Sequence, residues 1–255
     1  MDESKLYEML ESKHVPNIKI FNELNSTNQY CLDNNVVDAS IIVSKKQTAG
    51  RGQRGHKFYS PKDTGIYFSM VLPVSTRFLV NPGMLTIGAG VAVSKAIYEL
   101  SGIKVGLKWI NDVYLNNHKC IGILVETNMD EDNHIQSFVI GVGLNLYPND
   151  FPSDIRHRAG FLFKQHSFSN EKIIAKIYNN VVNMYFNQSN RYILDKYRNM
   201  LIWVGKKVQI NIEKNGLVYG VIQGIDDLSR LLVKIDTGHV YHCNYSDASN
   251  LRLIE

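Results

Sequence analysis

Between Gln47 and Lys57 the sequence reads Q-T-A-G-R-G-Q-R-G-H-K, so three glycines lie within six residues beside two arginines and a lysine. Closely spaced glycines let a ligand approach the backbone because no Cβ stands in the way. Arginine can hold a phosphate or a carboxylate through two parallel hydrogen bonds. The residue types predict an anion-binding loop, although an RG-rich flexible loop or a nucleic-acid-binding segment would have the same composition.

A strand should position this loop. Ile41–Val43 is a short apolar run just upstream and predicts a buried strand. Binding loops are commonly carried on the ends of such rigid elements. We therefore expect the glycine-rich loop to start from the end of a strand.

Three further groups of residues could do chemistry. They are S-T-N (Ser26–Asn28), K-W-I-N-D (Lys108–Asp112), and K-C-I-G-I-L-V-E (Lys119–Glu126) followed by G-V-G-L-N (Gly141–Asn145). A glycine inside a strand often marks a place where a ligand or another backbone comes close. Taken singly, each group has a structural alternative: Ser26 or Thr27 can simply cap a helix, and a lone lysine is usually solvated.

The remaining pattern predicts alternating strands and helices. Strands are expected at Ile18–Phe21, Gly65–Leu72, Cys120–Val125 and Phe138–Leu146, and helices at 2–13, from Ser26 or Thr27 to about Asn34, at Asn81–Gly102, and from Ser169 or Asn170 to about Asn199. Residues 149–168 read as irregular. Short alternating segments between Val208 and Ile254, separated by turn residues such as Asn215–Gly216, predict a small antiparallel barrel.

Composition limits the class of protein. The 255 residues are 44% hydrophobic and 20% charged with a net charge of +4, which is typical of a globular protein and compatible with anionic substrates. Three cysteines far apart in the sequence argue against a disulfide framework. The charged N-terminus is not a signal peptide, and no apolar run has membrane-spanning length, so we expect a cytoplasmic protein without a membrane partner. The histidines show no metal-ligand spacing, and no metal-ligating residue is predicted.

Together, in this order and spacing, the four motifs resemble the catalytic domain of biotin protein ligases over roughly residues 18 to 200, and the barrel-like tail resembles the family's small C-terminal domain. The resemblance implies an α/β (α+β) fold: a mixed sheet with packed helices, like class II synthetases, plus an SH3-like β-barrel. The expected domains are residues 1–202 and 203–255. This organisation is that of a monofunctional ligase without the N-terminal DNA-binding domain of some relatives.

The resemblance also implies a two-step reaction. Biotin and ATP with Mg²⁺ give biotinyl-5′-AMP, and a lysine of a biotin carboxyl carrier protein then attacks the adenylate. A carboxylate is a poor acyl donor, whereas its mixed anhydride with AMP is a good one. The protein must bring two anions together and keep water from the anhydride. The expected partners are biotin, ATP and the carrier domain, not DNA; relatives of this type are monomers or homodimers.

Residue roles follow from the family's motifs. As catalytic residues the resemblance implies Arg51, Asp112 and Lys119. Biotin-binding positions are Ser26, Thr27, Asn28, Gln47, Gly50, Arg51, Gly52, Gln53, Lys119, Gly122 and Gly141. ATP or adenylate positions are Arg51, Arg54, Phe58, Lys108, Asn111 and Asn145, and Lys57 could also neutralise phosphate. Asp112 would orient the incoming lysine or the magnesium.

Two positions depart from the family pattern. Gln53 stands where G-R-G-R-R-G sequences carry arginine, and Ile110 replaces a usual proline. Loss of one charge-assisted bond, roughly 1.5–3 kcal/mol, would weaken adenylate retention by about tenfold to a hundredfold. Compensation by a neighbour such as Arg54 is the alternative. Ile110 makes the turn less preset but should leave Asp112 in place, because β-branched residues also favour extended backbone.

Three other functions fit the sequence less well. A DNA-binding repressor would need more than the fewer than 20 residues that precede the catalytic region. A lipoate-protein ligase would carry a different glycine-rich loop after an Arg-Arg pair. A biotin-binding pseudo-ligase without catalysis is suggested by Gln53, but Arg51, Asp112 and Lys119 are all present.

Overall fold

The larger part of the molecule is built on a mixed seven-stranded sheet. The computed structural model describes residues 1–254. In spatial order the strands are β1 (Asn17–Phe21), β2 (Ser40–Ser44), β3 (Gly65–Pro73), β7 (Ile135–Asn145), β6 (His118–Met129), β5 (Asp112–Leu115) and β4 (Gly106–Lys108). β1 and β2 are parallel and every other neighbouring pair is antiparallel. The apolar run Ile41–Val43 is buried as predicted, and the serines at both ends of β2 are buried with it.

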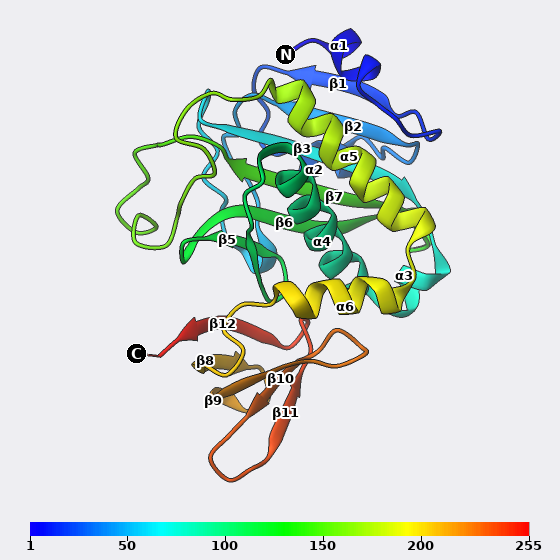
Figure 1. Cartoon of the computed structure of the whole chain (residues 1–255). Coiled ribbons are helices and arrows are strands. Elements are labelled where there is room, and N and C mark those ends of the chain that lie inside the picture. The colour runs from blue at the N-terminus through cyan, green and yellow to red at the C-terminus, as the bar shows by residue number, and fades with distance from the viewer. Residues whose placement is uncertain (255) are drawn as a thin grey trace.

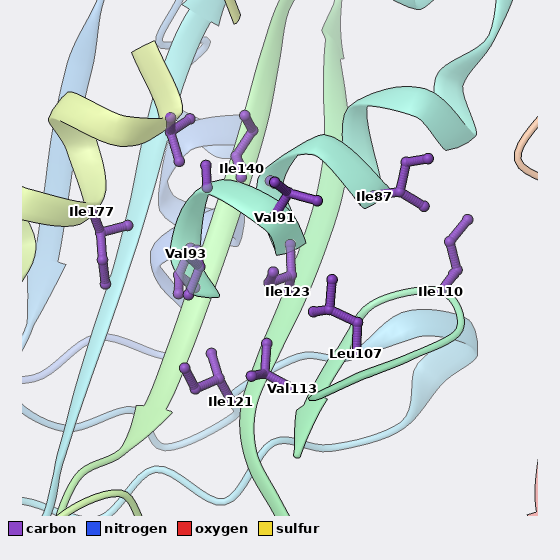
Figure 2. Close-up of a cluster of buried hydrophobic side chains, with 14 of the residues drawn as sticks. Ile87, Val91, Val93, Leu107, Ile110, Val113, Ile121, Ile123, Ile140 and Ile177 are labelled. Atoms are coloured by element: carbon purple, nitrogen blue, oxygen red, sulfur yellow. The ribbon is translucent and has the colours of Figure 1, made fainter. Parts of the chain in front are cut away.

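Helices cover both faces of this sheet. The helices are α1 (Glu3–Glu8), α2 (Thr27–Asp33), α3 (Thr76–Val80), α4 (Pro82–Ser101), α5 (Asn170–Asn187) and α6 (Asn190–Met200). Figure 1 shows α4 and α5 lying over one face of the sheet. Figure 2 shows Val91 of α4 beside Ile123 of the sheet, and Ile87 of the same helix toward Ile110. On the other face α2 buries Cys31 with residues of β2, β3 and β7.

Local signals account for the ends of α4. The side chain of Asn81 accepts a hydrogen bond from the backbone N–H of Met84, and Pro82 occupies the first turn. Gly102 ends the helix with a left-handed backbone (φ 71°), a conformation that glycine adopts without steric cost. The helix predicted at Asn81–Gly102 is confirmed.

The single helix predicted from Ser169 to about Asn199 is wrong. α5 ends at Asn187, Gln188 and Ser189 are extended, and the Ser189 hydroxyl caps α6 by accepting from the N–H of Tyr192. Serine favours such caps because its oxygen satisfies a free N–H of the first turn. The helix predicted at 2–13 is also shorter, ending at Glu8. Strand β6 contains the predicted segment Cys120–Val125 and extends beyond it, whereas β7 starts three residues before the predicted Phe138 and ends at Asn145, one residue before the predicted Leu146.

The C-terminal residues form a second, five-stranded antiparallel sheet. Its spatial order is β11 (Val240–Cys243), β10 (Leu231–Lys234), β9 (Gly216–Ile225), β8 (Lys207–Ile212) and β12 (Ala248–Leu253). Its turns include Gly216 and Gly238, both with positive φ. This sheet packs beneath α6 (Figure 1), where the indole N–H of Trp109 donates to the carbonyl of Ser229 at 2.9 Å. The predicted fold class, with its small C-terminal β structure, is confirmed. None of the helices within residues 1–254 is long and apolar enough to cross a membrane.

Candidate active site

The glycine-rich loop follows β2, as expected, and folds back on itself. The N–H of Phe58 donates to the carbonyl of Gly50 at 2.9 Å, and the N–H of Gly52 donates to the carbonyl of His56 at 2.7 Å. Arg54 has a left-handed backbone (φ 54°) at the tip. Because its own main chain closes it, the loop is a structured hairpin and not a flexible linker.

A pocket of about 330 Å³ lies between this loop and strand β6. Its walls are residues 49–57 together with Leu124 and Glu126. Leu124 and Glu126 share a face of β6 with Gly122, since alternate residues of a strand point the same way. The pocket therefore presents cationic loop residues opposite one carboxylate.

Arg51 is held by that carboxylate. Its Nη2 lies 2.6 Å from Oε1 of Glu126, and its Nη1 donates to Oε1 of Gln29. The other oxygen of Glu126 accepts from Nδ2 of Asn28 at 2.9 Å. Glu126 and Gln29 were not among the predicted site residues. Side chains alternate in direction along a strand, so Glu126 could have been assigned to the same face as the predicted Gly122. No comparable sequence signal points to Gln29.

A polar cluster adjoins the pocket at the start of α2. The backbone N–H of Thr27 donates to Oε1 of Gln47 at 2.8 Å, and Nε2 of Gln47 donates to the hydroxyl of Ser60 at 2.9 Å. The hydroxyl of Ser69 lies 2.7 Å from Oγ1 of Thr27 and 2.6 Å from Oδ1 of Asn28. The structure thus brings three predicted residues together and adds two serines that sequence reasoning missed.

Ser26 has a different place in this cluster. Its hydroxyl accepts from the N–H of Gln29 at 3.4 Å and caps α2, while the side chain itself is buried. This is the structural alternative considered for the S-T-N motif. The cap aims the first turn of α2, and hence Thr27 and Asn28, at the sheet.

The strand glycines make room for two side chains. A Cβ on Gly141 would lie 2.2 Å from Oδ1 of Asn28, and Cβ atoms on Gly122 and Gly143 would lie 2.9 and 2.6 Å from the ring of Phe58. The ring of Phe58 therefore lies across β6 and β7. Lys119 approaches it, with Nζ 5.7 Å from the ring centroid.

Lys108, Asp112 and Lys119 form one charged group. Oδ1 of Asp112 is 2.6 Å from Nζ of Lys119, and Oδ2 is 3.9 Å from Nζ of Lys108. The β4–β5 hairpin pairs Lys108 with Asp112, and β6 brings Lys119 alongside. Burial lowers the pKa of Lys108, and the negative charge of Asp112 opposes that shift. Ile110 is buried in the core between them, and the Trp109–Ile110 peptide is cis.

Other predicted residues lie apart from the pocket walls or are engaged elsewhere. The guanidinium of Arg54 donates to the carbonyls of Tyr245 and Ser246. Nδ2 of Asn111 donates to the carbonyl of Ile123 at 2.9 Å. Asn145 is buried at the end of β7, where its carbonyl accepts from the N–H of Leu162. Among residues 1–254 no three His, Cys, Asp or Glu side chains form a metal-binding group.

Known proteins resemble this chain in sequence and in fold. Residues 20–145 match the biotin/lipoate A/B protein ligase family. The bifunctional ligase/repressor BirA of Bacillus subtilis is 32% identical over 215 residues, which are 81% of this chain and 65% of that protein, so the chain spans about two thirds of that relative. The biotin–[acetyl-CoA-carboxylase] ligase of Mycobacterium tuberculosis is 25% identical over 85% of this chain and 80% of its own length. The solved biotin protein ligase from Aquifex aeolicus, in complex with biotin and ATP, has a TM-score of 0.81 at 25% identity and covers 93% of this chain and 99% of its own.

Proposed function

We propose that the chain, whose residues 20–145 match the biotin/lipoate A/B protein ligase family, is an ATP-dependent biotin–[biotin carboxyl carrier protein] ligase. The carboxylate of biotin would attack the α-phosphorus of ATP and release pyrophosphate, and a lysine of a carrier domain would then attack the biotinyl-AMP and release AMP. The observation that carries the proposal is that Arg51 lines a pocket joined through Glu126 to the buried Asn28, while Lys119, on the same strand as Glu126, lies beside the ring of Phe58. One relative is a biotin–[acetyl-CoA-carboxylase] ligase and another was solved with biotin and ATP, so biotin, ATP and a carboxylase acceptor are the chemistry to test.

Biotin would bind with its ring toward the polar cluster. Thr27, Asn28 and Gln47 offer hydroxyl and amide groups of both hydrogen-bonding kinds, which suit a ureido ring. A buried polar site rejects analogues that leave its groups unpaired. Gly122 and Gly141 carry no side chain and so leave space on the sheet beside the ligand. The backbone of Gly50, Gly52 and Gln53 would close over the ligand.

The acid end of biotin would meet ATP between Arg51 and Lys119. Arg51 exchanges Glu126 for the ligand carboxylate or the α-phosphate, both of which it can hold with paired hydrogen bonds. Lys119 lies beside the acyl oxygen and stabilises the negative charge that develops as the anhydride forms. Phe58, Asn111 and Asn145 are the proposed adenine-side positions, and Arg54, Lys57 and Lys108 would neutralise phosphate.

Magnesium would enter with ATP. Mg²⁺ commonly binds substrate phosphates plus one or two carboxylates while keeping several waters. Asp112, a partly buried carboxylate beside two lysines, is the donor that fits such an ion. When bound, the ion would neutralise phosphate charge. The alternative role for Asp112 is to orient the acceptor lysine for attack on the adenylate.

We further propose that residues 1–202 form the catalytic domain and 203–255 a domain that helps to hold ATP or the carrier in a cytoplasmic enzyme, either monomeric or homodimeric. Hydrogen bonds from Arg54 and Trp109 to the second sheet support this assignment. Truncation near Val204 with unchanged kinetics would contradict it.

Mass spectrometry of the purified chain with biotin and Mg-ATP tests the proposal, with and without a biotin carboxyl carrier domain. We expect biotinyl-AMP in the first mixture and a biotinylated carrier lysine in the second. Lys119→Gln should abolish both products, whereas Lys62→Gln, an exposed loop lysine, should form them normally. Adenylate formation only from lipoate would indicate a lipoate ligase, and biotin binding without adenylate would indicate a pseudo-ligase.

A further inference from the structure

A buried serine of strand β3 connects two of the polar side chains at the start of α2. Ser69 is fully buried, and its hydroxyl oxygen lies 2.7 Å from Oγ1 of Thr27 and 2.6 Å from Oδ1 of Asn28. Ser69 pairs across the sheet with Gly141, and the missing side chain of that glycine leaves the space that Asn28 fills. Paired residues of neighbouring strands point to the same face, so Ser69 meets Asn28 there. These buried polar side chains must complete their hydrogen bonds with one another.

The hydrogen bonds of Asn28 fix the direction of its amide. Its Nδ2 lies 3.2 Å from the main-chain carbonyl oxygen of Leu124 and 2.9 Å from Oε2 of Glu126. A carbonyl oxygen can only accept, so the amide nitrogen faces these two oxygens and Oδ1 faces Ser69. Because Oδ1 carries no hydrogen, Ser69 donates its single hydroxyl proton to Asn28.

The direction of the next hydrogen bond follows from this one. Ser69 has no second proton to give, so the hydroxyl of Thr27, at 2.7 Å, donates to Ser69. Oε1 of Gln47 lies farther from Oγ1 of Thr27, at 3.3 Å, and already accepts from the backbone N–H of Thr27 at 2.8 Å. With its one proton given to Ser69, the Thr27 oxygen offers lone pairs to a ligand and no donor.

We propose that Ser69 is a positioning residue that sets this proton order and, through Thr27, selects the kind of ring that the site binds. A ring that presents an N–H to Thr27 gains a hydrogen bond, whereas a ring oxygen at the same place would face the lone pairs of Thr27 with its own. The site therefore prefers a cyclic urea to a cyclic carbamate. The inference rests on the proposed binding of biotin with its ring toward this cluster.

The test compares the Kd of biotin with that of its two cyclic carbamate analogues, in each of which oxygen replaces one ring N–H. Calorimetric titration of the wild type should show one carbamate binding about tenfold or more weakly than biotin. In Ser69→Ala the Thr27 hydroxyl is free to turn its proton toward the ring oxygen. The ratio of the two Kd values should then fall to about threefold or less.

Ser94 provides the matched control. It is a buried serine of α4 whose hydroxyl has no hydrogen-bond partner among residues 1–254. Ser94→Ala removes the same atom from the core without touching the polar cluster, so it should keep the wild-type ratio. A ratio that changed equally in Ser94→Ala and Ser69→Ala would overturn the proposal.

The ratio of Kd values also separates positioning from a general loss of structure. Ser69→Ala leaves Oδ1 of Asn28 without a donor, but that loss weakens all three ligands alike and cancels in the ratio. Thr27→Val should lower the ratio by itself, and adding Ser69→Ala should then change it no further. An unchanged ratio in Ser69→Ala, or an equal further drop in the Thr27→Val protein, would contradict a role through Thr27.

A measurement without ligand separates this inference from the proposed ligase reaction. Neutron diffraction from crystals of the deuterated protein locates hydroxyl deuterons directly. We expect the Ser69 deuteron to point to Asn28 and the Thr27 deuteron to point to Ser69; a Ser69 deuteron directed at Thr27 would overturn the proton order.

The outcomes for the two proposals are distinct. If the wild type bound biotin but formed no adenylate, the ligase proposal would fail, whereas the deuteron positions and the Kd ratios would still support Ser69 as the selecting residue. If the wild type bound no biotin, the selection of a ring by Ser69 would fail together with the proposed function.

Discussion

Arg54, at the tip of the glycine-rich loop, donates a hydrogen bond of 2.5 Å to the main-chain carbonyl of Ser246, almost two hundred residues further along the chain. A second bond of 3.0 Å reaches the carbonyl of Tyr245. The loop that walls the pocket is thereby tied to the turn between β11 and β12. The glycine-rich loop and the second sheet are therefore linked by direct hydrogen bonds in this structure.

Replacing Arg54 by alanine should loosen this tie. We expect faster amide hydrogen exchange at residues 50–57 and also at 244–247, because each segment loses its partner. Retention of adenylate should fall by roughly threefold to tenfold, as expected for one or two hydrogen bonds from a charged donor. Arg191→Ala removes an exposed arginine and is the matched control. Faster exchange in the loop alone would contradict the coupling.

Gln53→Arg should restore a charge that the family pattern carries. We hypothesise that wild-type protein releases adenylate, so that nearby lysines on other proteins are labelled. The substitution should then lower labelling of a bystander protein, by about tenfold or more for one charge-assisted bond. Streptavidin blotting of a mixture containing a non-substrate protein measures this. Equal labelling of the bystander by wild type and by Gln53→Arg would contradict the hypothesis.

Glu126→Gln should strengthen anion binding. Arg51 must leave Glu126 before it can hold a carboxylate or phosphate, and the carboxylate itself repels such ligands. Since Arg51 is partly exposed and solvent screens the pair, the gain should be only about twofold to fivefold in the Kd of biotin or ATP. Calorimetric titration provides the value. Weaker binding would mean instead that Glu126 positions Arg51 in the bound state.

Gly141→Ala should disrupt the polar cluster. The new methyl group would collide with Asn28, which is held by Ser69 and Glu126 and cannot move freely. We expect a loss of about 1–3 kcal/mol in the free energy of unfolding, typical of overpacking, and at least tenfold weaker biotin binding. Gly90→Ala in α4 is the control, because its Cβ meets nothing nearer than 3.4 Å. Denaturant unfolding compares the two; equal stability would contradict the clash.

Asp226 should make the second sheet sensitive to acid. Burial disfavours its charge, but hydrogen bonds from His242 and Arg230 outweigh that effect and hold the pKa of the carboxyl below its usual value. Because the folded-state pKa is depressed, the stabilisation is present above the unfolded value of about 4. It is lost as the pH falls through the lower folded value.

Asp226→Asn should therefore lower the melting temperature at pH 7, with a loss of about 1–2 kcal/mol, and the difference from wild type should shrink below about pH 4. Thermal unfolding followed at several pH values checks this. Asp236→Asn, at an exposed turn position, should show no such difference. If the stability difference between wild type and Asp226→Asn stayed constant down to about pH 2, lost packing and not lost charge would explain it.

Much of this fold could be predicted because its signals are local. The apolar run at Ile41–Val43 became a buried strand, and Asn81 with Gly102 bounded α4 as their capping preferences require. The amphipathic pattern, by contrast, runs through both α5 and α6, so the break at Gln188–Ser189 was not predicted from it. Periodicity measures which side of a helix is apolar and is insensitive to a two-residue change of direction between two helices.

The sequence by itself determined the alternation of strands and helices, the glycine-rich loop after β2 and the residue types suited to holding anions, since each depends on neighbours a few residues apart. Only the tertiary structure decided that Arg51 pairs with Glu126, that Arg54 reaches Ser246 and that Trp203 covers Lys108. These partners lie tens to hundreds of residues apart. Which of them meet is decided by sheet order and by how the second sheet packs, and no local propensity encodes either.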